Sequence, residues 1–513
     1  MSRVIQSLPV NRVEGDLEIR VEMEGDIVRN AWSAGTLYRG FENIMRGRGP
    51  LDGLVITPRV CGICSTAHLT AAAKALDYLF EASVPANGTR IRNITLGTEI
   101  LQNDVRQAVL LFMCDFVNPA YASFPLYSEA VARYEPLKGS SARRTLSETA
   151  RLIEIIAILG GQWPHSSFMV PGGVVSTPGN REFTQCRVLL SQYRSWYEKE
   201  VLGCSLSRWS AVKTRVDLES WLDEKKTHQE GDLGFFIRFS RAAGLETLGR
   251  GCGNFISFGS LDIPRRSGVV GVYNTRTLLP SGFQTVSDVR MLDHYKITED
   301  VAYSWLSGGK DHLHPFEGIT APYATGDEGK RYSWAKAPRY DGVPAETGPL
   351  AELAISRNPL IAELLQTGIP NVFIRELARI IRPAVLLPAL DAWLEELPLS
   401  KEKFFLAYPH REDGEGFGLI EAPRGALGHW VTLKNNKIAS YQIITPTTWN
   451  ASPRDAAGVC GPMEQALIGT RVKDMENPIE LGHIVRSFDP CLVCTVHAVT
   501  LGPSSKPLSL AST

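Results

Sequence analysis

The sequence has no long apolar run and almost no excess of charge. No stretch of about 18 consecutive apolar, uncharged residues, the length that a membrane-spanning helix needs, occurs among its 513 residues. The first residues also lack the basic and then apolar pattern of a secretory signal, so we expect no leader peptide and no direct membrane span. A formal net charge of -1 and a pI near 6.8 give no sign of a basic surface that would bind nucleic acids or anionic membranes. Any membrane contact would therefore go through a partner.

Cysteine is scarce and its number is odd, which argues against a disulfide framework. Nine cysteines occur in the 513 residues, and four of them form two Cys-x-x-Cys pairs. The other five are scattered, as reduced and mostly buried thiols are: Cys114, Cys186, Cys204, Cys252 and Cys460. We therefore expect a reducing compartment, the cytoplasm, and a chain with no cysteine set left for iron–sulfur clusters.

Apolar periodicity predicts a mainly helical chain with small β elements, an α+β fold. With 44% hydrophobic residues the chain can bury a large core, and its length alone would predict about three domains. Alternating apolar residues predict a strand hairpin at 15–34 and further strands at 415–445. Helical periodicity follows the first cysteine pair and continues in later segments: 91–113, 143–159, 181–202 and much of 349–397. The helix after the first cysteine pair and the three at 91–113, 143–159 and 181–202 are four long helices in succession. Such a series favours a bundle at the centre.

The two cysteine pairs lie near opposite ends of the chain. Cys61 and Cys64 form the first, Cys491 and Cys494 the second, and a histidine follows each pair by a few residues. Sulfurs one turn apart can converge on one soft metal centre. More than 400 residues separate the pairs, so a shared metal requires the chain ends to pack together, and we expect residues 1–497 to form one interlocked unit. The residues alone leave open a closed structural zinc site and a catalytic soft-metal site.

The sequence around the cysteines favours the catalytic site. Six stretches resemble, in the right order, the large subunit of nickel–iron hydrogenases: YRGFENIMRGR, RVCGICSTAH, EAPRGALGHW, YQIITPTTWNASPRD, VRSFDPC and DPCLVCTVH. The resemblance covers the chain from Tyr38 to His497. It implies the fold of that subunit, with the two chain ends meeting at the metal site.

The resemblance also implies a nickel–iron centre held by the four cysteines. Cys61 and Cys491 would be terminal nickel ligands, and Cys64 and Cys494 would bridge nickel and iron. Carbon monoxide and two cyanides would complete the iron shell. Because no side chain supplies these ligands, nickel-insertion proteins and other maturation partners are implied.

Three polar residues near the centre are implied in the same way: Arg424, Thr447 and Asp489. Arg424 and Thr447 match the hydrogen-bond donors to the cyanides, and Arg424 lies over the open nickel position with Asp489 beside it. That pair would polarise hydrogen or stabilise the transition state, whereas the alternative for Arg424 is an ordinary surface ion pair. His68 either donates a hydrogen bond to a bridging thiolate or is a plain core histidine.

Glu14 matches the family's carboxylate that takes the proton from the cysteine corresponding to Cys491. Burial would suit this relay, because it raises the pKa of a carboxyl group toward that of its donor. The alternative is an ordinary glutamate at the end of a strand. The family often has histidine where this chain has Asp16, so the hydrogen bonds around the relay would differ.

A second, hard-metal site is implied by Glu42, the main-chain carbonyl of Ile443 and His497. Magnesium usually occupies it in the family, in keeping with its preference for oxygen ligands and water. Such a site would tie the N-terminal hairpin to the C-terminal end of the chain.

The helix at 102–107 departs from the family pattern. Many members carry a histidine-rich aspartate motif there, near the arginine over the nickel, and this chain places Asn103 or Asp104 at the aspartate. We favour Asp104. The lack of histidines indicates a divergent branch, such as the cytosolic uptake or sensing groups.

The sequence therefore predicts a catalytic subunit that converts H2 reversibly to protons and electrons, in an uptake role. Electrons would pass to an iron–sulfur small subunit, in a heterodimer or a higher oligomer. The alternatives are an H2-sensing regulatory subunit and, in a different class, a non-catalytic four-cysteine zinc scaffold. The resemblance also implies that a nickel-dependent maturation protease removes residues 498–513, which directly follow His497. The alternative is a frayed terminus.

Overall fold

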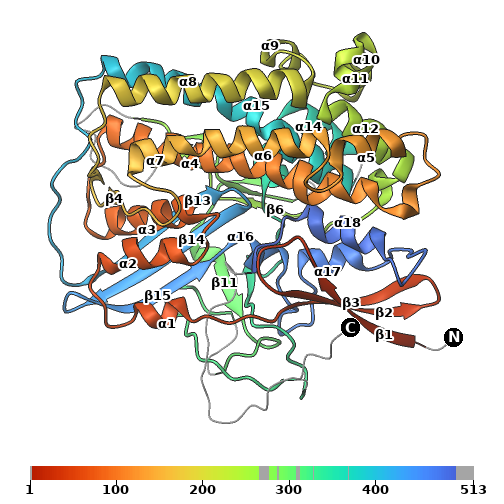
Figure 1. The fold of residues 1–513 in the computed structure, drawn as a ribbon. Coiled ribbons are helices and arrows are strands. Elements are labelled where there is room, and N and C mark those ends of the chain that lie inside the picture. The colour runs from red at the N-terminus through yellow and green to blue at the C-terminus, as the bar shows by residue number, and fades with distance from the viewer. Residues whose placement is uncertain are drawn as a thin grey trace.

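A layer of long helices lies over small antiparallel sheets in the computed structural model (Figure 1). The structure describes residues 3–264, 276–285, 288–307, 312–326, 328–367 and 369–492. Cys494, His497 and the predicted tail at 498–513 lie outside the described residues.

Long helices form the predicted bundle, although α15 (Val372–Glu396) belongs to it in place of the helix after the first cysteine pair, which packs on the C-terminal sheet. The other long helices of the bundle are α4 (Ala86–Arg106), α6 (Ser140–Leu152) and α8 (Asn180–Trp196). α4 packs against α15 and α6, and α8 packs against α15 and α6. The side chain of Asn371 begins α15 by accepting a hydrogen bond from the N–H of Ile374 at 3.0 Å, a regular N-cap.

Shorter helices surround this layer. They are α1 (Phe41–Met45), α2 (Asp52–Ile56), α5 (Tyr127–Tyr134), α7 (Glu154–Gly160), α9 (Leu206–Trp209), α10 (Arg215–Glu224), α11 (Lys226–Glu230), α12 (Asp232–Ala243), α13 (Pro349–Ile355), α14 (Pro359–Thr367), α16 (Pro446–Asn450), α17 (Pro462–Leu467) and α18 (Ile479–Ser487). The short strands are β4 (Met169–Val170), β5 (Gly173–Val174), β6 (Phe255–Ser257), β7 (Ser260–Asp262), β8 (Thr277–Leu279), β9 (Gly282–Gln284), β10 (Val289–Arg290), β11 (Ile297–Asp300) and β12 (Ala337–Tyr340).

The N-terminal sheet contains the predicted hairpin and one strand more. β2 (Leu17–Glu24) and β3 (Ile27–Gly35) pair antiparallel around Gly25, whose φ of 64° suits glycine. β1 (Arg3–Val10) adds an edge beside β2. The apolar pattern does not reveal β1, because its side chains from Ile5 to Val10 are exposed or only half-buried.

The C-terminal sheet confirms the strands predicted at 415–445. β13 (Gly414–Ala422), β14 (Gly425–Lys434) and β15 (Lys437–Ile444) pair antiparallel in sequence order. Asn435 and Asn436, with φ of 51° and 56°, form the tight turn between β14 and β15. The turn between β13 and β14 consists of Pro423 and Arg424 alone, so Arg424 lies at a hairpin tip.

Helix α3 (Ser65–Leu79) packs unusually closely on β13. A Cβ added at Gly416 would lie 2.2 Å from the carbonyl oxygen of Ala75, and one at Gly418 would lie 2.0 Å from that of Ala71. The two glycines and the alanine-rich face of α3 therefore allow helix and strand to touch through their backbones. This contact holds the N-terminal end of α3 beside the β13–β14 hairpin.

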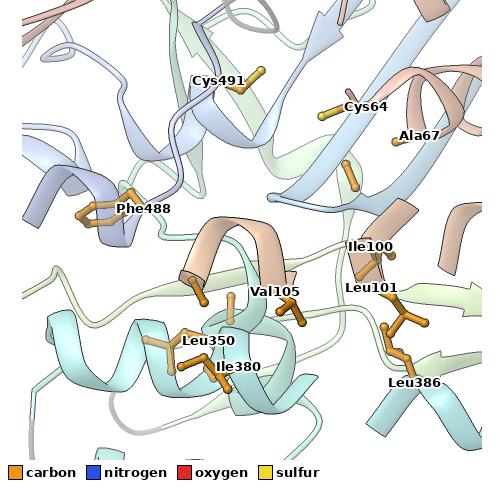
Figure 2. Close-up of a cluster of buried hydrophobic side chains, with 14 of the residues drawn as sticks. Cys64, Ala67, Ile100, Leu101, Val105, Leu350, Ile380, Leu386, Phe488 and Cys491 are labelled. Atoms are coloured by element: carbon orange, nitrogen blue, oxygen red, sulfur yellow. The ribbon is translucent and has the colours of Figure 1, made fainter. Parts of the chain in front are cut away.

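The two ends of the described chain meet in one hydrophobic core. Its largest cluster runs from Leu17 to Leu492 and includes Cys61, Cys64 and Cys491. Figure 2 shows Cys64 and Cys491 on facing segments, beside core residues of the long helices. No helix among the described residues is long and apolar enough to cross a membrane.

Candidate metal centre

Three of the four predicted cysteine ligands converge. The ligand atoms of Cys61, Cys64 and Cys491 all lie within 4.8 Å of one another, and all three side chains are buried. Cys61 Sγ lies 3.6 Å from Cys491 Sγ, too far for a disulfide and near the ~3.8 Å that two thiolates about 2.3 Å from one tetrahedral ion adopt. Among the described residues no other group of three or more His, Cys, Asp or Glu forms such a cluster. The donor set therefore fits a soft metal.

The first cysteine pair lies at the entry to a helix. Cys64 is the N-cap residue of α3 and lies at the positive end of the helix dipole. Glu99 of α4 fixes this helix end by accepting the backbone N–H groups of Thr66 and Ala67 at 2.9 and 3.0 Å. Burial raises the pKa of Glu99 to about 7. The sequence analysis missed Glu99, because a carboxylate in a helix interior gives no local sign of a distant partner.

The segment carrying Cys491 is held against the N-terminal part of the chain. Cys491 forms an isolated parallel bridge with Glu14, and the N–H of Leu492 donates to the carbonyl oxygen of Glu14 at 2.6 Å. Asp489, at a φ of 51°, turns the chain out of α18 in a left-handed conformation that is uncommon for a residue other than glycine. This turn brings Cys491 to Cys61.

Arg424 lies directly over the sulfur cluster. Its Nη1 donates to Cys64 Sγ at 2.9 Å, and its Nε lies 3.1 Å from Asp489 Oδ1 in an ion pair that is not aligned as a hydrogen bond. Burial opposes the charge, but Asp489 and the three cysteines outweigh it and raise the pKa of Arg424 above its usual value. Arg424 is thus a buried, permanent cation at the cluster, and its alternative as a surface ion pair is wrong.

Thr447 also contacts the cysteine segment. Its Oγ1 accepts the backbone N–H of Cys491 at 2.8 Å, on the first turn of α16. Since a hydroxyl accepts and donates at once, the hydrogen of Thr447 stays available for another acceptor. The threonine therefore positions the Cys491 backbone in addition to the donor role that the sequence implies.

The helix α4 presents Asn103, and not Asp104, to this pair. Asn103 Nδ2 donates to Asp489 Oδ2 at 2.8 Å. Asp104 lies on another face of α4 and pairs with fully buried Arg382 at 2.7 Å. Our preference for Asp104 is therefore wrong, because two adjacent helix positions point about 100° apart and spacing by eye did not fix the register.

Glu14 lies beside Cys491 through its backbone, but its side chain is exposed. The burial that we expected for this carboxylate is not found in the described chain. The position next to the terminal cysteine agrees with a proton relay, whereas the argument from burial does not hold.

Two of the three residues predicted to bind a hard metal lie together. Glu42 Oε1 accepts the N–H of Ile443 at 2.9 Å, and Glu42 Oε2 accepts the hydroxyl of Thr320. A cavity of about 20 Å³, room for about one water molecule, lies beside them. Carboxylate oxygens and water fit Mg²⁺, although the ammonium of Lys336, 3.6 Å from Glu42 Oε2, competes for the same carboxylate. The predicted histidine ligand lies outside the described residues.

Buried sulfurs from both chain ends, with a fixed cation beside them, form a candidate soft-metal centre, and the comparisons with known proteins identify the class of protein. The family model described as nickel-dependent hydrogenase matches residues 39–132 and 236–497. The chain belongs to this family.

Two relatives and one solved structure support the same family assignment. The periplasmic [NiFeSe] hydrogenase large subunit of Desulfomicrobium baculatum is 33% identical over 96% of this chain and 94% of its own. The quinone-reactive Ni/Fe-hydrogenase large chain of Wolinella succinogenes is 27% identical over 97% of this chain and 96% of its own. The reduced Ni-Fe-Se hydrogenase of D. vulgaris Hildenborough superposes with a TM-score of 0.80 at 29% identity, covering 97% of this chain and 100% of that one. The predicted family and fold are confirmed.

Proposed function

We propose that this chain is the catalytic large subunit of a nickel–iron hydrogenase, splitting H2 into protons and electrons. The observation that carries the proposal is the convergence of Cys61, Cys64 and Cys491 beneath Arg424. A nickel–iron centre, when bound there, supplies the soft, electron-rich site that heterolytic cleavage of H2 requires.

The thiolates act as ligands and as the first base. Cys61, Cys64, Cys491 and Cys494 would hold the centre, and the thiolate of Cys491 would take the first proton. Glu14, bonded through its backbone to the segment of Cys491, then carries that proton away. Thiolate and carboxylate are suitable successive bases, because both exchange protons readily once positioned within reach.

Arg424 supplies fixed positive charge where negative charge develops. It is paired with Asp489 and donates to Cys64 already in the absence of substrate, so no reorganisation is needed during the reaction. Arg424 and the hydroxyl of Thr447 would donate hydrogen bonds to the cyanide ligands of the centre. Glu42, Ile443 and His497 would hold a magnesium ion that ties the chain ends together.

Electrons leave through a partner. Of the nine cysteines, the five outside the two pairs are scattered in the sequence, and the part of the chain that the structure describes holds no second cysteine cluster. The acceptor is a small subunit that carries such clusters, in a heterodimer or a larger assembly. A cytoplasmic site of action stays a prediction, because one relative is named periplasmic and another quinone-reactive.

Hydrogen-dependent dye reduction tests the function. The purified large and small subunits together should reduce a viologen dye under H2 and stop when H2 is replaced by argon. A complex that contains nickel and iron but shows no H2-dependent reduction would contradict the proposed activity.

The tail at 498–513 is a maturation peptide in this proposal. Its 16 residues are small and polar, and they directly follow the predicted ligand His497. An attached tail would keep the Cys491 segment away from Cys61, leaving a path for metal loading, and its removal would close the site. Intact mass of active protein should correspond to a chain ending at His497, and protein made without nickel should keep all 513 residues. Full activity in a chain that retains the tail would refute this processing.

A further inference from the structure

A buried chain of three side chains runs from the first cysteine helix into the C-terminal sheet. His68 Nδ1 lies 3.1 Å from His429 Nε2, and His429 Nδ1 lies 2.9 Å from the hydroxyl of Tyr441. The exposed fractions are 1% for His68, 0% for His429 and 3% for Tyr441. The three come from α3, β14 and β15, and none belongs to the sulfur cluster.

Only one ring nitrogen of His68, Nε2, remains for the metal centre. His68 lies four residues after Cys64, the N-cap residue of α3, and helical side chains lean toward the preceding turn, so its ring points toward the end of the helix that carries Cys64. Its Nδ1 is taken by His429. Any hydrogen bond from His68 to a thiolate or to a metal-bound group must therefore use Nε2.

The hydrogen-bonded chain can run in only two directions. With both imidazoles neutral, each ring carries one N–H and leaves its other nitrogen as an acceptor. In the inward direction Tyr441 donates to His429, His429 donates to His68, and His68 Nε2 carries the hydrogen. In the outward direction His68 Nε2 carries a lone pair, and the phenol becomes an acceptor.

Two observations favour the inward direction. The buried hydroxyl of Tyr441 has no recorded acceptor other than His429 among the described residues, so the outward direction would leave its hydrogen unsatisfied. The sulfurs of Cys61, Cys64 and Cys491 are anionic when they ligate a metal, and negative charge attracts an N–H and repels a lone pair.

We propose that Tyr441 and His429 are positioning residues that lock His68 as the Nε2–H tautomer, so that His68 presents a hydrogen-bond donor to the metal centre. The proposal rests on the proposed function for the identity of that centre, but not for the direction of the chain. A second-sphere partner that fixes which nitrogen of an imidazole carries its hydrogen also fixes what that imidazole can do at a metal site.

Nitrogen NMR of histidine reads the direction directly. In deuterated protein labelled with ¹⁵N-histidine, His68 should show a protonated, pyrrole-type Nε2 and an unprotonated, pyridine-type Nδ1. Tyr441→Phe removes only the hydroxyl, after which both directions become available and the two nitrogens of His68 should move toward each other. In His429→Gln the side-chain amide nitrogen can take the place of His429 Nε2 and donate to His68 Nδ1. The nitrogens of His68 should therefore keep the parent pattern in this variant.

Tyr197→Phe is the matched control. Tyr197 is also fully buried, and its hydroxyl donates to the carbonyl oxygen of Ile380 at 2.7 Å, away from this chain of residues. Its removal should leave His68 unchanged. In loaded protein, Tyr441→Phe should also lower the stretching frequency of iron-bound carbon monoxide, because a thiolate that loses a donor returns electron density to the metal.

The outcomes separate this proposal from the proposed function. A pyridine-type Nε2 on His68 in the parent protein, or unchanged His68 nitrogens in folded Tyr441→Phe, would overturn the tautomer lock. Should Tyr441→Phe fail to fold, the parent spectrum alone decides. A protein that binds zinc and shows no carbon monoxide band would refute the hydrogenase function, while the nitrogen spectrum would still report the direction of the chain.

Discussion

Replacement of Cys491 by serine should lower bound nickel to trace levels and H2 oxidation by at least about a thousandfold, a loss of about 4 kcal/mol in transition-state stabilisation. Cys491 is fully buried, and its Sγ lies 3.6 Å from that of Cys61. A serine hydroxyl keeps its proton near neutral pH and is a hard ligand, so it replaces neither the soft ligand nor the first base. Nickel analysis and H2-dependent dye reduction on the same preparation measure both losses.

Cys460→Ser is the matched control for this loss. Cys460 is half-buried and lies outside the sulfur cluster, so its replacement should leave nickel content and activity at the parent level. Normal nickel content in Cys491→Ser would show that Cys491 is not a required ligand.

Replacement of Glu14 by glutamine should slow proton exit by about 100- to 10,000-fold, the usual contribution of a positioned acid–base group. The amide keeps the size and the backbone bridge to Cys491 but cannot carry a proton. Nickel and iron contents should not change, since Glu14 is not a ligand. Isotope exchange between H2 and deuterated water measures the effect, because exchange requires the proton to leave the site.

Glu18→Gln controls for the lost charge. Glu18 lies further along the chain, on strand β2, where its carboxylate pairs with the guanidinium of Arg20 at 2.6 Å. This variant should exchange at the parent rate. If Glu14→Gln also exchanges at the parent rate, another group near Cys491 is the relay.

The fold was predictable where local pattern and burial agree. The hairpin of β2 and β3 and the helix α3 follow from alternation and helical periodicity in the sequence. The edge strand β1 was missed, because side chains that are exposed or half-buried leave no clear alternation. The close packing of α3 on β13 depends on glycines whose partners are more than 300 residues away, which a local pattern does not reveal.

The site was predictable where the residues lie in motifs, and not where they act through space. Arg424, Asp489 and Thr447 fall in stretches that resemble the family, and the structure brings Arg424 to Cys64, Thr447 to Cys491 and Asp489 to Arg424. Glu99 has no motif of its own and was missed.

Two other sequence interpretations depended on geometry that a sequence does not contain. Asn103 rather than Asp104 meets Asp489, which only the rotation of α4 decides. The contact of His429 and Tyr441 with His68 depends on the pairing of β14 with β15, which no local sequence pattern indicates.

The central claim is that the cysteines from the two chain ends hold one nickel and one iron, and metal analysis combined with infrared spectroscopy of matured protein tests it most directly. The account predicts one nickel and one iron per chain, with bands from iron-bound carbon monoxide and cyanide. Stoichiometric zinc without these bands would contradict it and would return the site to a structural four-cysteine scaffold.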